Sequence, residues 1–165
     1  AALRQRWQVV ALPRHPQADA ELRSEASRSG IRLVEEGSPV SGAWRWESRL
    51  GVLADHYRAA DVAFVGGSLL PFGGHNPLEP AACGAAVILG PHHATQHEAA
   101  HALEQARAIA IAAPGTELAA TVARLLADDS ERARLARAGL GVVSRMRGAG
   151  RRAAERLREW DLWPV

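Results

Sequence analysis

The residues best suited to chemistry lie between positions 62 and 80. The run 62–65 is short, apolar and rich in valine, which is typical of a buried strand. Residues 66–76, called the glycine loop below, follow it and include Gly66, Gly67, Ser68, Gly73 and Gly74. Glycine lets backbone N–H groups come close to a ligand because no Cβ stands in the way. Two glycine pairs in one loop therefore favour backbone contact with a ligand over a simple turn.

A helix is expected directly after the glycine loop. Asn76 is a natural N-cap, Pro77 suits the first helical position, and Glu79 occupies the third. The first N–H groups of a helix have no partner within it, so this end favours anions. The spacing of Asn76 and Glu79 also has the form of a capping box, in which the glutamate bonds back to the cap. His75 lies at the rim, where an imidazole either donates a hydrogen bond or only packs.

Two further loops carry polar residues after predicted strands. Arg14 and His15 follow a strand predicted at 7–12, and Gly90, Pro91 and His92 follow one predicted at 86–89. Ligands of parallel sheets bind at the carboxyl ends of the strands, so we expect these loops to surround one cleft with the glycine loop. Arginine suits such a cleft because its guanidinium binds phosphate and carboxylate with two parallel hydrogen bonds.

Strands and helices alternate along most of the chain. The predicted strands are 7–12, 31–35, 62–65, 86–89 and 109–112. The predicted helices are 17–29, 50–60, 77–83, 96–107 and 116–127, with two more between 130 and 160, and 37–48 is predicted to be a loop. This order indicates βαβ units. The predicted fold class is therefore α/β, a Rossmann-like parallel sheet with helices on both faces, in a single domain spanning residues 1–165.

The amino-acid composition is that of a globular chain with a hydrophobic core. The chain has 165 residues, of which 47% are hydrophobic, enough to bury a core. It contains no apolar run of membrane-spanning length, and its single cysteine excludes an internal disulfide. All 20 basic residues are arginine, and nine of them lie within 131–160 against Glu131, Glu155 and Glu159. A bias in the base composition of the gene explains most of these arginines. Their charged side chains are then simply solvated, as charged side chains usually are.

Several strings in the chain are long enough to compare with known families. They are Val65-Gly66-Gly67-Ser68-Leu69, Gly73-Gly74-His75-Asn76-Pro77-Leu78-Glu79-Pro80, Gly90-Pro91-His92 and Pro13-Arg14-His15-Pro16. Together they resemble the donor-binding half of the Kdo transferases, which move 3-deoxy-D-manno-octulosonic acid (Kdo) from CMP-Kdo onto a lipid A precursor. The likeness covers residues 6–127, and its longest string is far more specific than a lone glycine pair.

The resemblance implies the C-terminal half of a GT-B glycosyltransferase of lipopolysaccharide biosynthesis. It implies CMP-Kdo as donor, a lipid A precursor as acceptor, no cofactor, no metal and no nucleic acid. The full-length enzyme is expected at the cytoplasmic face of the bacterial inner membrane. The first βα unit of the donor domain is expected to be missing, and the general base is expected in a missing N-terminal domain. The catalytic residue is therefore unknown, and we expect the fragment to be soluble and inactive alone.

The resemblance also assigns roles to individual residues. Donor binding is expected of Arg14, His15, Gly66, Gly67, Ser68, Gly73, Gly74, His75, Asn76, Glu79, Gly90, Pro91 and His92. We expect the Glu79 carboxylate to accept both hydroxyls of the ribose. We expect Arg14 to bind the phosphate or the sugar carboxylate of the donor.

The chain departs from the family in two places. The family motif Asp-Ser/Thr-Leu/Met-Gly-Glu-Leu aligns with 48–53, where Ser48 and Val52 replace the acidic residues. Glu47, one residue earlier, is a candidate substitute. Where the family commonly has Thr-Phe-Asn-Phe, this chain has His93-Ala94-Thr95-Gln96, so aromatic packing is lost there.

Other functions remain open at this point. One is a nucleotide-sugar epimerase of the same fold, and another is a non-catalytic nucleotide-binding module. A metal site is disfavoured: His97 and His101 have the i, i+4 spacing of helical zinc ligands, but no carboxylate pattern completes the set.

Overall fold

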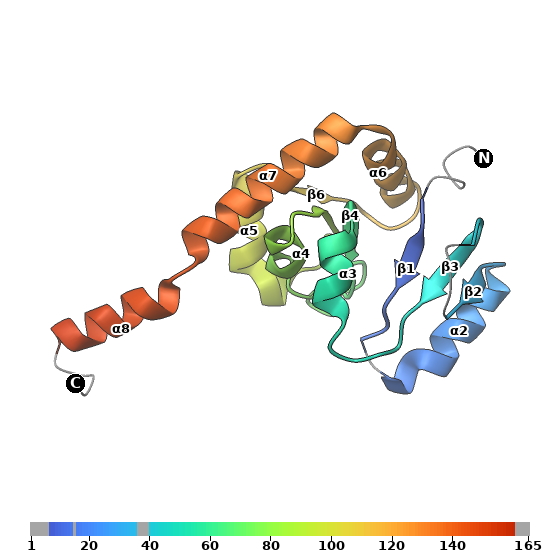
Figure 1. Cartoon of the computed structure of the whole chain (residues 1–165), viewed down its shortest axis with the longest axis horizontal. Coiled ribbons are helices and arrows are strands. Elements are labelled where there is room, and N and C mark those ends of the chain that lie inside the picture. The colour runs from blue at the N-terminus through green and yellow to red at the C-terminus, as the bar shows by residue number, and fades with distance from the viewer. Residues whose placement is uncertain (1–6, 15, 36–39, 161–165) are drawn as a thin grey trace. The chain divides into compact units, whose positions relative to one another are not determined.

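The computed structural model describes residues 7–14, 16–35 and 40–160. The chain divides into two compact units, Ala1–His56 and Tyr57–Val165, and each contains one three-stranded parallel sheet (Figure 1). The predicted α/β class with parallel strands flanked by helices is confirmed. The prediction that residues 1–165 act as one domain stays a prediction.

The first unit contains β1 (Val9–Ala11), η1 (Pro16–Ala18), α2 (Asp19–Arg28), β2 (Arg32–Val34) and β3 (Ala43–Trp46). The strand order is β1-β3-β2, with Trp44 of β3 level with Val9 on one side and Leu33 on the other. The predicted loop at 37–48 was therefore wrong at β3. Its tryptophans favour strands and alternate with Ala43 and Arg45, but Gly42 and nearby serines and prolines suggested a turn.

Trp46 joins α2 to β3 within the first unit. Its indole Nε1 donates a 2.7 Å hydrogen bond to Asp19, and the Arg23 guanidinium lies 5.0 Å above the centre of its ring. Arg23 also donates to Asp19 at 2.6 Å. The hydrogen bond from Arg23, and then the one from Trp46, hold the pKa of the Asp19 carboxyl below its ordinary value. One helix is thus fixed on the central strand of this sheet.

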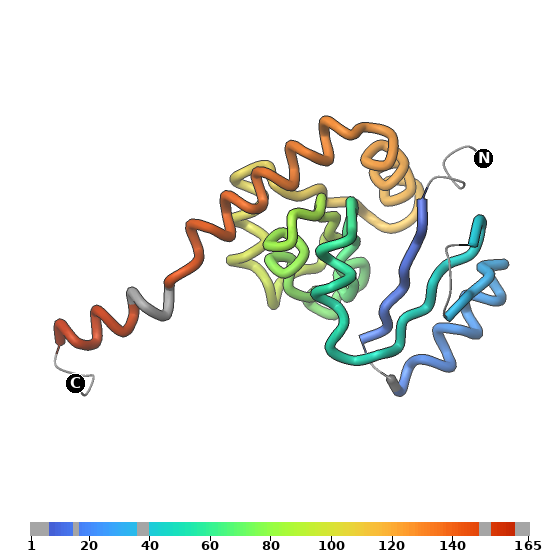
Figure 2. Tube along the Cα trace, viewed as in Figure 1, coloured from blue at the N-terminus to red at the C-terminus, as the bar shows by residue number. Residues whose placement is uncertain are grey.

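The second unit follows α3 (Leu53–Ala59), which crosses the division between the units. Its elements are β4 (Val62–Val65), α4 (Leu78–Ala82), β5 (Ala86–Leu89), η2 (Ala94–Gln96), α5 (His97–Gln105), β6 (Ile109–Ile111), α6 (Thr116–Ala127), α7 (Asp129–Met146) and α8 (Ala149–Glu159). The strand order is β4-β5-β6. Figure 2 traces the chain from β4 in green through α5 in yellow to α7 in orange.

Strand β5 is the centre of the second unit, and all four of its residues are fully buried. Val87 and Leu89 belong to one apolar cluster, which includes Leu103 of α5. Ala86 and Ile88 belong to a second cluster, which includes Leu125 of α6 and Leu135 of α7. Successive strand residues point to opposite faces, so this sheet is covered by helices on both faces, as predicted.

Agreement with the predicted boundaries is closest around the glycine loop. The structure matches the predicted bounds of β4, β5 and α6. Helix α4 is shorter than predicted, and the predicted helix 96–107 begins with the 3-10 turn η2 and ends at Gln105. No helix in the described part of the chain has the length and apolar character needed to cross a membrane.

Candidate functional site

The glycine loop connects the carboxyl end of β4 to α4 and is closed at its base by its own backbone. Gly74 N donates to Gly67 O at 2.8 Å, and His75 N donates to Gly66 O at 3.2 Å. A Cβ at Gly67 would lie 3.3 Å from the His75 ring, and the φ of Gly67 is +71°. A side chain at this position would be both strained and crowded. Two backbone hydrogen bonds and the crowding at Gly67 therefore define the shape of the loop.

Ser68 joins the glycine loop to the loop after β5. Its hydroxyl donates to Val65 O at 2.6 Å and accepts from Gly90 N at 2.9 Å, while its carbonyl accepts from His92 N at 2.9 Å. Ser68 has no exposed surface. The Ser68 hydroxyl is thus engaged on both sides by the protein, and Ser68 holds the two loops together through its side chain and its backbone.

Thr95 makes a second connection between these loops and was missed by the sequence analysis. Its hydroxyl donates to Gly73 O at 2.6 Å, and its backbone N–H donates to the same oxygen at 3.1 Å. The partners lie 22 residues apart in sequence. The only signal in the sequence was that 93–96 departs from the resembled family, which did not indicate this contact.

The N-cap of α4 is Pro77, not Asn76 as predicted, but the side chain of Asn76 still bonds the start of the helix. Asn76 Oδ1 accepts from Leu78 N at 3.0 Å, which satisfies one of the free donors at the helix start. The helix begins at Leu78, so Pro77 precedes it rather than occupying its first position. Asn76 Nδ2 donates to Glu79 Oε1 at 3.2 Å. Glu79 thus bonds the side chain of Asn76, not a backbone N–H as in a capping box.

The Glu79 carboxylate lies at the surface, near a tyrosine. Burial raises the pKa of the Tyr57 phenol, and the negative charge of Glu79 raises that pKa further. Tyr57 therefore stays protonated at neutral pH and keeps a hydroxyl hydrogen to donate. The Glu79 carboxylate itself is exposed.

A cavity of about 330 Å³ lies beside the glycine loop, lined by Pro71, Gly73, Pro91, His92, His93, Ala94 and His97. His93 Nδ1 lies 3.0 Å from Gly90 O, and its Nε2 lies 3.5 Å from a Glu104 oxygen. His97 and His101 stack with ring centroids 5.9 Å apart. Across 7–14, 16–35 and 40–160, no three His, Cys, Asp or Glu side chains gather as metal ligands would.

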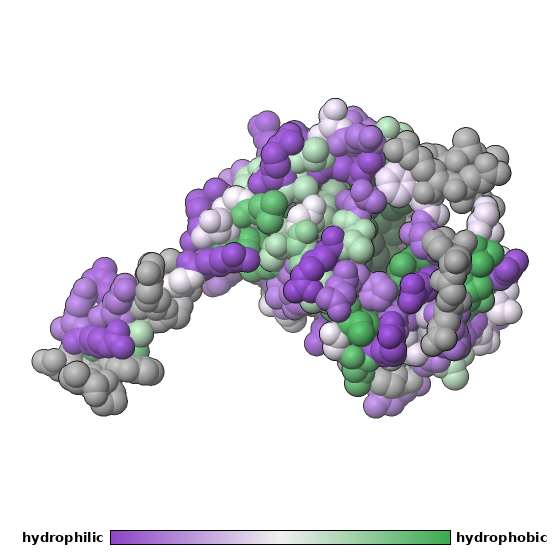
Figure 3. Space-filling view, in the orientation of Figure 1, coloured by the Kyte–Doolittle hydropathy of each residue, from purple (hydrophilic) through white to green (hydrophobic). Residues whose placement is uncertain are grey.

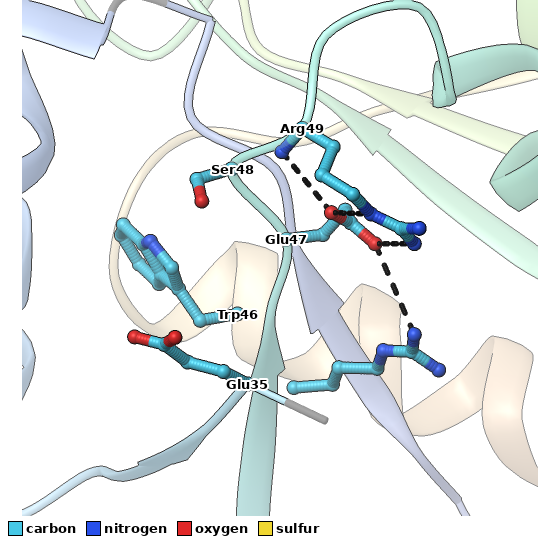
Figure 4. A pocket seen from close by; sticks show the side chains of 6 residues that line it. Glu35, Trp46, Glu47, Ser48 and Arg49 are labelled. Carbon is cyan, nitrogen blue, oxygen red and sulfur yellow. Dashed lines mark hydrogen bonds and ion pairs between the residues drawn. The ribbon is translucent and has the colours of Figure 1, made fainter. Parts of the chain in front are cut away.

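A second cavity, of about 310 Å³, lies at the carboxyl edge of the first sheet (Figure 4). Its lining includes Glu47, whose carboxylate accepts from Arg49 N at 3.1 Å, Nε at 2.9 Å and Nη2 at 2.7 Å. His56 Nε2 lies 3.3 Å from the same carboxylate. The side-chain bond from Arg49, above all, holds the pKa of Glu47 far below its ordinary value. As placed, this candidate substitute for the missing acidic residues is engaged by its own chain.

The structure brings most of the predicted site residues together. The second unit contains Gly66, Gly67, Ser68, Gly73, Gly74, His75, Asn76, Glu79, Gly90, Pro91 and His92, all in two bonded loops and the start of α4. Arg14 is exposed and follows β1 in the first unit, while His15 lies outside the described residues. A common cleft with Arg14, and donor binding by all these residues, stay predictions.

The amino-acid sequence of the chain is similar to those of several known proteins. No protein-family model matches the chain. The chain is 34% identical over 158 residues to a 3-deoxy-D-manno-octulosonic acid transferase of Bordetella pertussis, and 37% identical over 161 residues to one of Haemophilus influenzae. Each match covers 92% of this chain and 37% of the relative. The chain therefore spans little more than a third of the length of these curated relatives.

Solved structures show the same fold. The crystal structure of the C-terminal CMP-Kdo binding domain of WaaA from Acinetobacter baumannii superposes with a TM-score of 0.75 at 23% identity, covering 82% of this chain and 73% of that one. The C-terminal domain of a group 1 family glycosyl transferase, LpcC from Francisella tularensis, superposes with a TM-score of 0.58 at 20% identity. This match covers 84% of this chain and 69% of that one. The sequence resemblance is thus confirmed, and the chain is a relative of the 3-deoxy-D-manno-octulosonic acid transferases.

Proposed function

We propose that this chain is the donor-binding domain of an inverting glycosyltransferase that transfers Kdo from CMP-Kdo to a lipid A precursor. The observation that carries the proposal is the glycine loop at the carboxyl end of β4, closed by its own backbone and followed by α4, whose first N–H bonds Asn76. The similarity to named Kdo transferases over 92% of the chain supports the choice of donor. An epimerase or a non-catalytic module has no comparable support.

The site chemistry suits a nucleotide with one phosphate and a sugar carboxylate. The backbone of the glycine loop approaches the donor, and the exposed Glu79 carboxylate accepts the ribose hydroxyls. Arg14 binds the phosphate or the sugar carboxylate, and His75 lies next to Asn76 in the loop. No metal takes part in this proposal, because CMP-Kdo has one phosphate and arginine supplies the opposing charge.

The reaction is a displacement at the anomeric carbon of Kdo. A hydroxyl of the lipid A precursor attacks that carbon while CMP leaves with the bonding electrons, so the configuration is inverted. This domain positions the donor and stabilises the negative charge on the departing phosphate. The general base belongs to a part of the enzyme outside this chain, and the reaction takes place at the cytoplasmic face of the inner membrane, where the lipid acceptor lies.

Thermal melting with different nucleotides tests the proposal directly. A ligand that binds only the folded chain raises the melting temperature according to its concentration relative to Kd. We expect CMP to raise the melting temperature of the wild-type chain and UDP to leave it unchanged. Stabilisation by UDP alone would instead support the epimerase, and no effect of either nucleotide would count against a donor-binding domain.

A further inference from the structure

The loop after β5 contains one side chain that acts directly on the glycine loop. The Thr95 hydroxyl donates to Gly73 O at 2.6 Å and lies 3.2 Å from Gly74 O, while its backbone N–H donates to Gly73 O at 3.1 Å. Both glycines are buried. Three polar contacts from one residue thus converge on two consecutive peptide groups.

The two loops also approach too closely for other side chains. A Cβ at Gly73 would lie 2.4 Å from Thr95 Cγ2, and one at Gly74 would lie 3.1 Å from His93 Cα. Both glycines have positive φ, +91° and +78°. The contact with 93–95 therefore requires glycine at both positions, in addition to the turn of the chain.

The carbonyls held by Thr95 belong to the segment that closes the glycine loop. Gly74 N bonds Gly67 O, and the next amide, His75 N, bonds Gly66 O. The segment then continues directly into Asn76, whose side chain bonds Leu78 N at the start of α4. A change in the orientation of the Gly73–Gly74 peptide would move His75 and Asn76 together.

We propose that Thr95 is a positioning residue, whose hydroxyl fixes the Gly73–Gly74 peptide and so sets the shape of the nucleotide-binding loop. The inference rests on the proposed function for the identity of the ligand, but the contact itself does not. Thr95 touches no donor atom in this account. It acts through Gly73 and Gly74, and its effect on affinity is indirect.

Thr95→Val tests this by removing the hydroxyl while keeping the shape, and Thr95→Ser keeps the hydroxyl. Amide hydrogen exchange at Gly74 and His75, followed by NMR, reports the loop, and calorimetric titration with CMP reports the affinity. We expect Thr95→Val to accelerate both amides and to weaken CMP binding about tenfold, because buried carbonyls lose a donor. Thr95→Ser should retain both properties to within about twofold. Thr121→Val, on α6, is a matched control that should alter neither readout.

The outcomes separate the two claims. Unchanged exchange in Thr95→Val would overturn the positioning role, and so would faster exchange with unchanged CMP affinity. If the wild-type chain does not bind CMP, the proposed function fails, and the exchange measurement alone then decides whether Thr95 holds the loop. A Thr95→Ser variant that behaves like Thr95→Val would also overturn the role assigned to the hydroxyl.

Discussion

Gly90 lies against the backbone of Ser68 so closely that a Cβ at position 90 would stand 2.2 Å from the Ser68 carbonyl oxygen. The same pair is bonded through Gly90 N and the Ser68 hydroxyl at 2.9 Å. No flexible side chain is available to move aside, because the crowded atoms belong to the backbone. Packing against Ser68 thus explains why glycine occupies position 90 of the Gly90-Pro91-His92 motif, independently of any ligand.

We predict that Gly90→Ala lowers the free energy of unfolding by about 1–3 kcal/mol, as overpacking of a dense interior does. The shift of Ser68 should also weaken CMP binding. Chemical denaturation and calorimetry measure the two effects. Gly141→Ala is the matched control: Gly141 lies in α7, and a Cβ there would have its nearest contact with Arg145 Nη1 at 3.5 Å. That change should stabilise the chain by about 0.5–1 kcal/mol, and equal losses in both variants would contradict the account.

We predict that Glu79→Gln weakens CMP binding by about 1.5–3 kcal/mol, the value of hydrogen bonds to a charged group. Stability should change little, because Glu79 is exposed and a glutamine oxygen can still accept from Asn76. Asn76→Ala is the contrasting variant, since it removes the side-chain acceptor of Leu78 N and should cost about 1 kcal/mol of stability. Calorimetry with CMP, run beside thermal melting, distinguishes them. A stability loss without an affinity loss in Glu79→Gln would leave Glu79 with a structural role only.

The sequence was informative where local chemistry decides structure. The bounds of β4 followed from the length of an apolar run, and the bond of Asn76 to the start of α4 followed from its side-chain chemistry, although the N-cap lies one residue later, at Pro77. The contact between Thr95 and Gly73 could not be predicted, because it depends on two loops meeting after the sheet forms. For the same reason the burial of Ser68 was not foreseen: only the assembled sheet supplies Gly90 N as its partner.

We predict that Glu47 makes the first unit sensitive to acid. Its pKa is depressed from the ordinary value of 4.5, so its contribution to stability is complete above that pH and declines as the pH falls towards the folded-state pKa. Glu47→Gln should therefore be less stable than wild type near neutral pH, and the difference should shrink below pH 4.5. Denaturation at several pH values measures this. Glu25→Gln, at an exposed ion pair, should show little difference at any pH, and a constant deficit for Glu47→Gln would contradict the linkage.

The last prediction concerns the arginine-rich segment 131–160, which includes most of α7 and all of α8. Arg156 and Arg158 are exposed, and the coloured surface of α8 in Figure 3 is mainly hydrophilic. The proposed lipid acceptor would bring the enzyme to a membrane, and anionic headgroups attract each nearby basic residue by about 1 kcal/mol. We therefore predict that the chain co-sediments with vesicles containing phosphatidylglycerol, and that added salt releases it.

Arg156→Gln and Arg158→Gln should each weaken this binding about fivefold, the equivalent of about 1 kcal/mol. Arg28→Gln, on α2, is the control and should leave sedimentation unchanged, because Arg28 lies outside the segment. Solvation of the helix surface is the competing explanation for these arginines. It predicts sedimentation that responds neither to anionic lipid nor to salt, and a comparison with vesicles of phosphatidylcholine alone decides between the two.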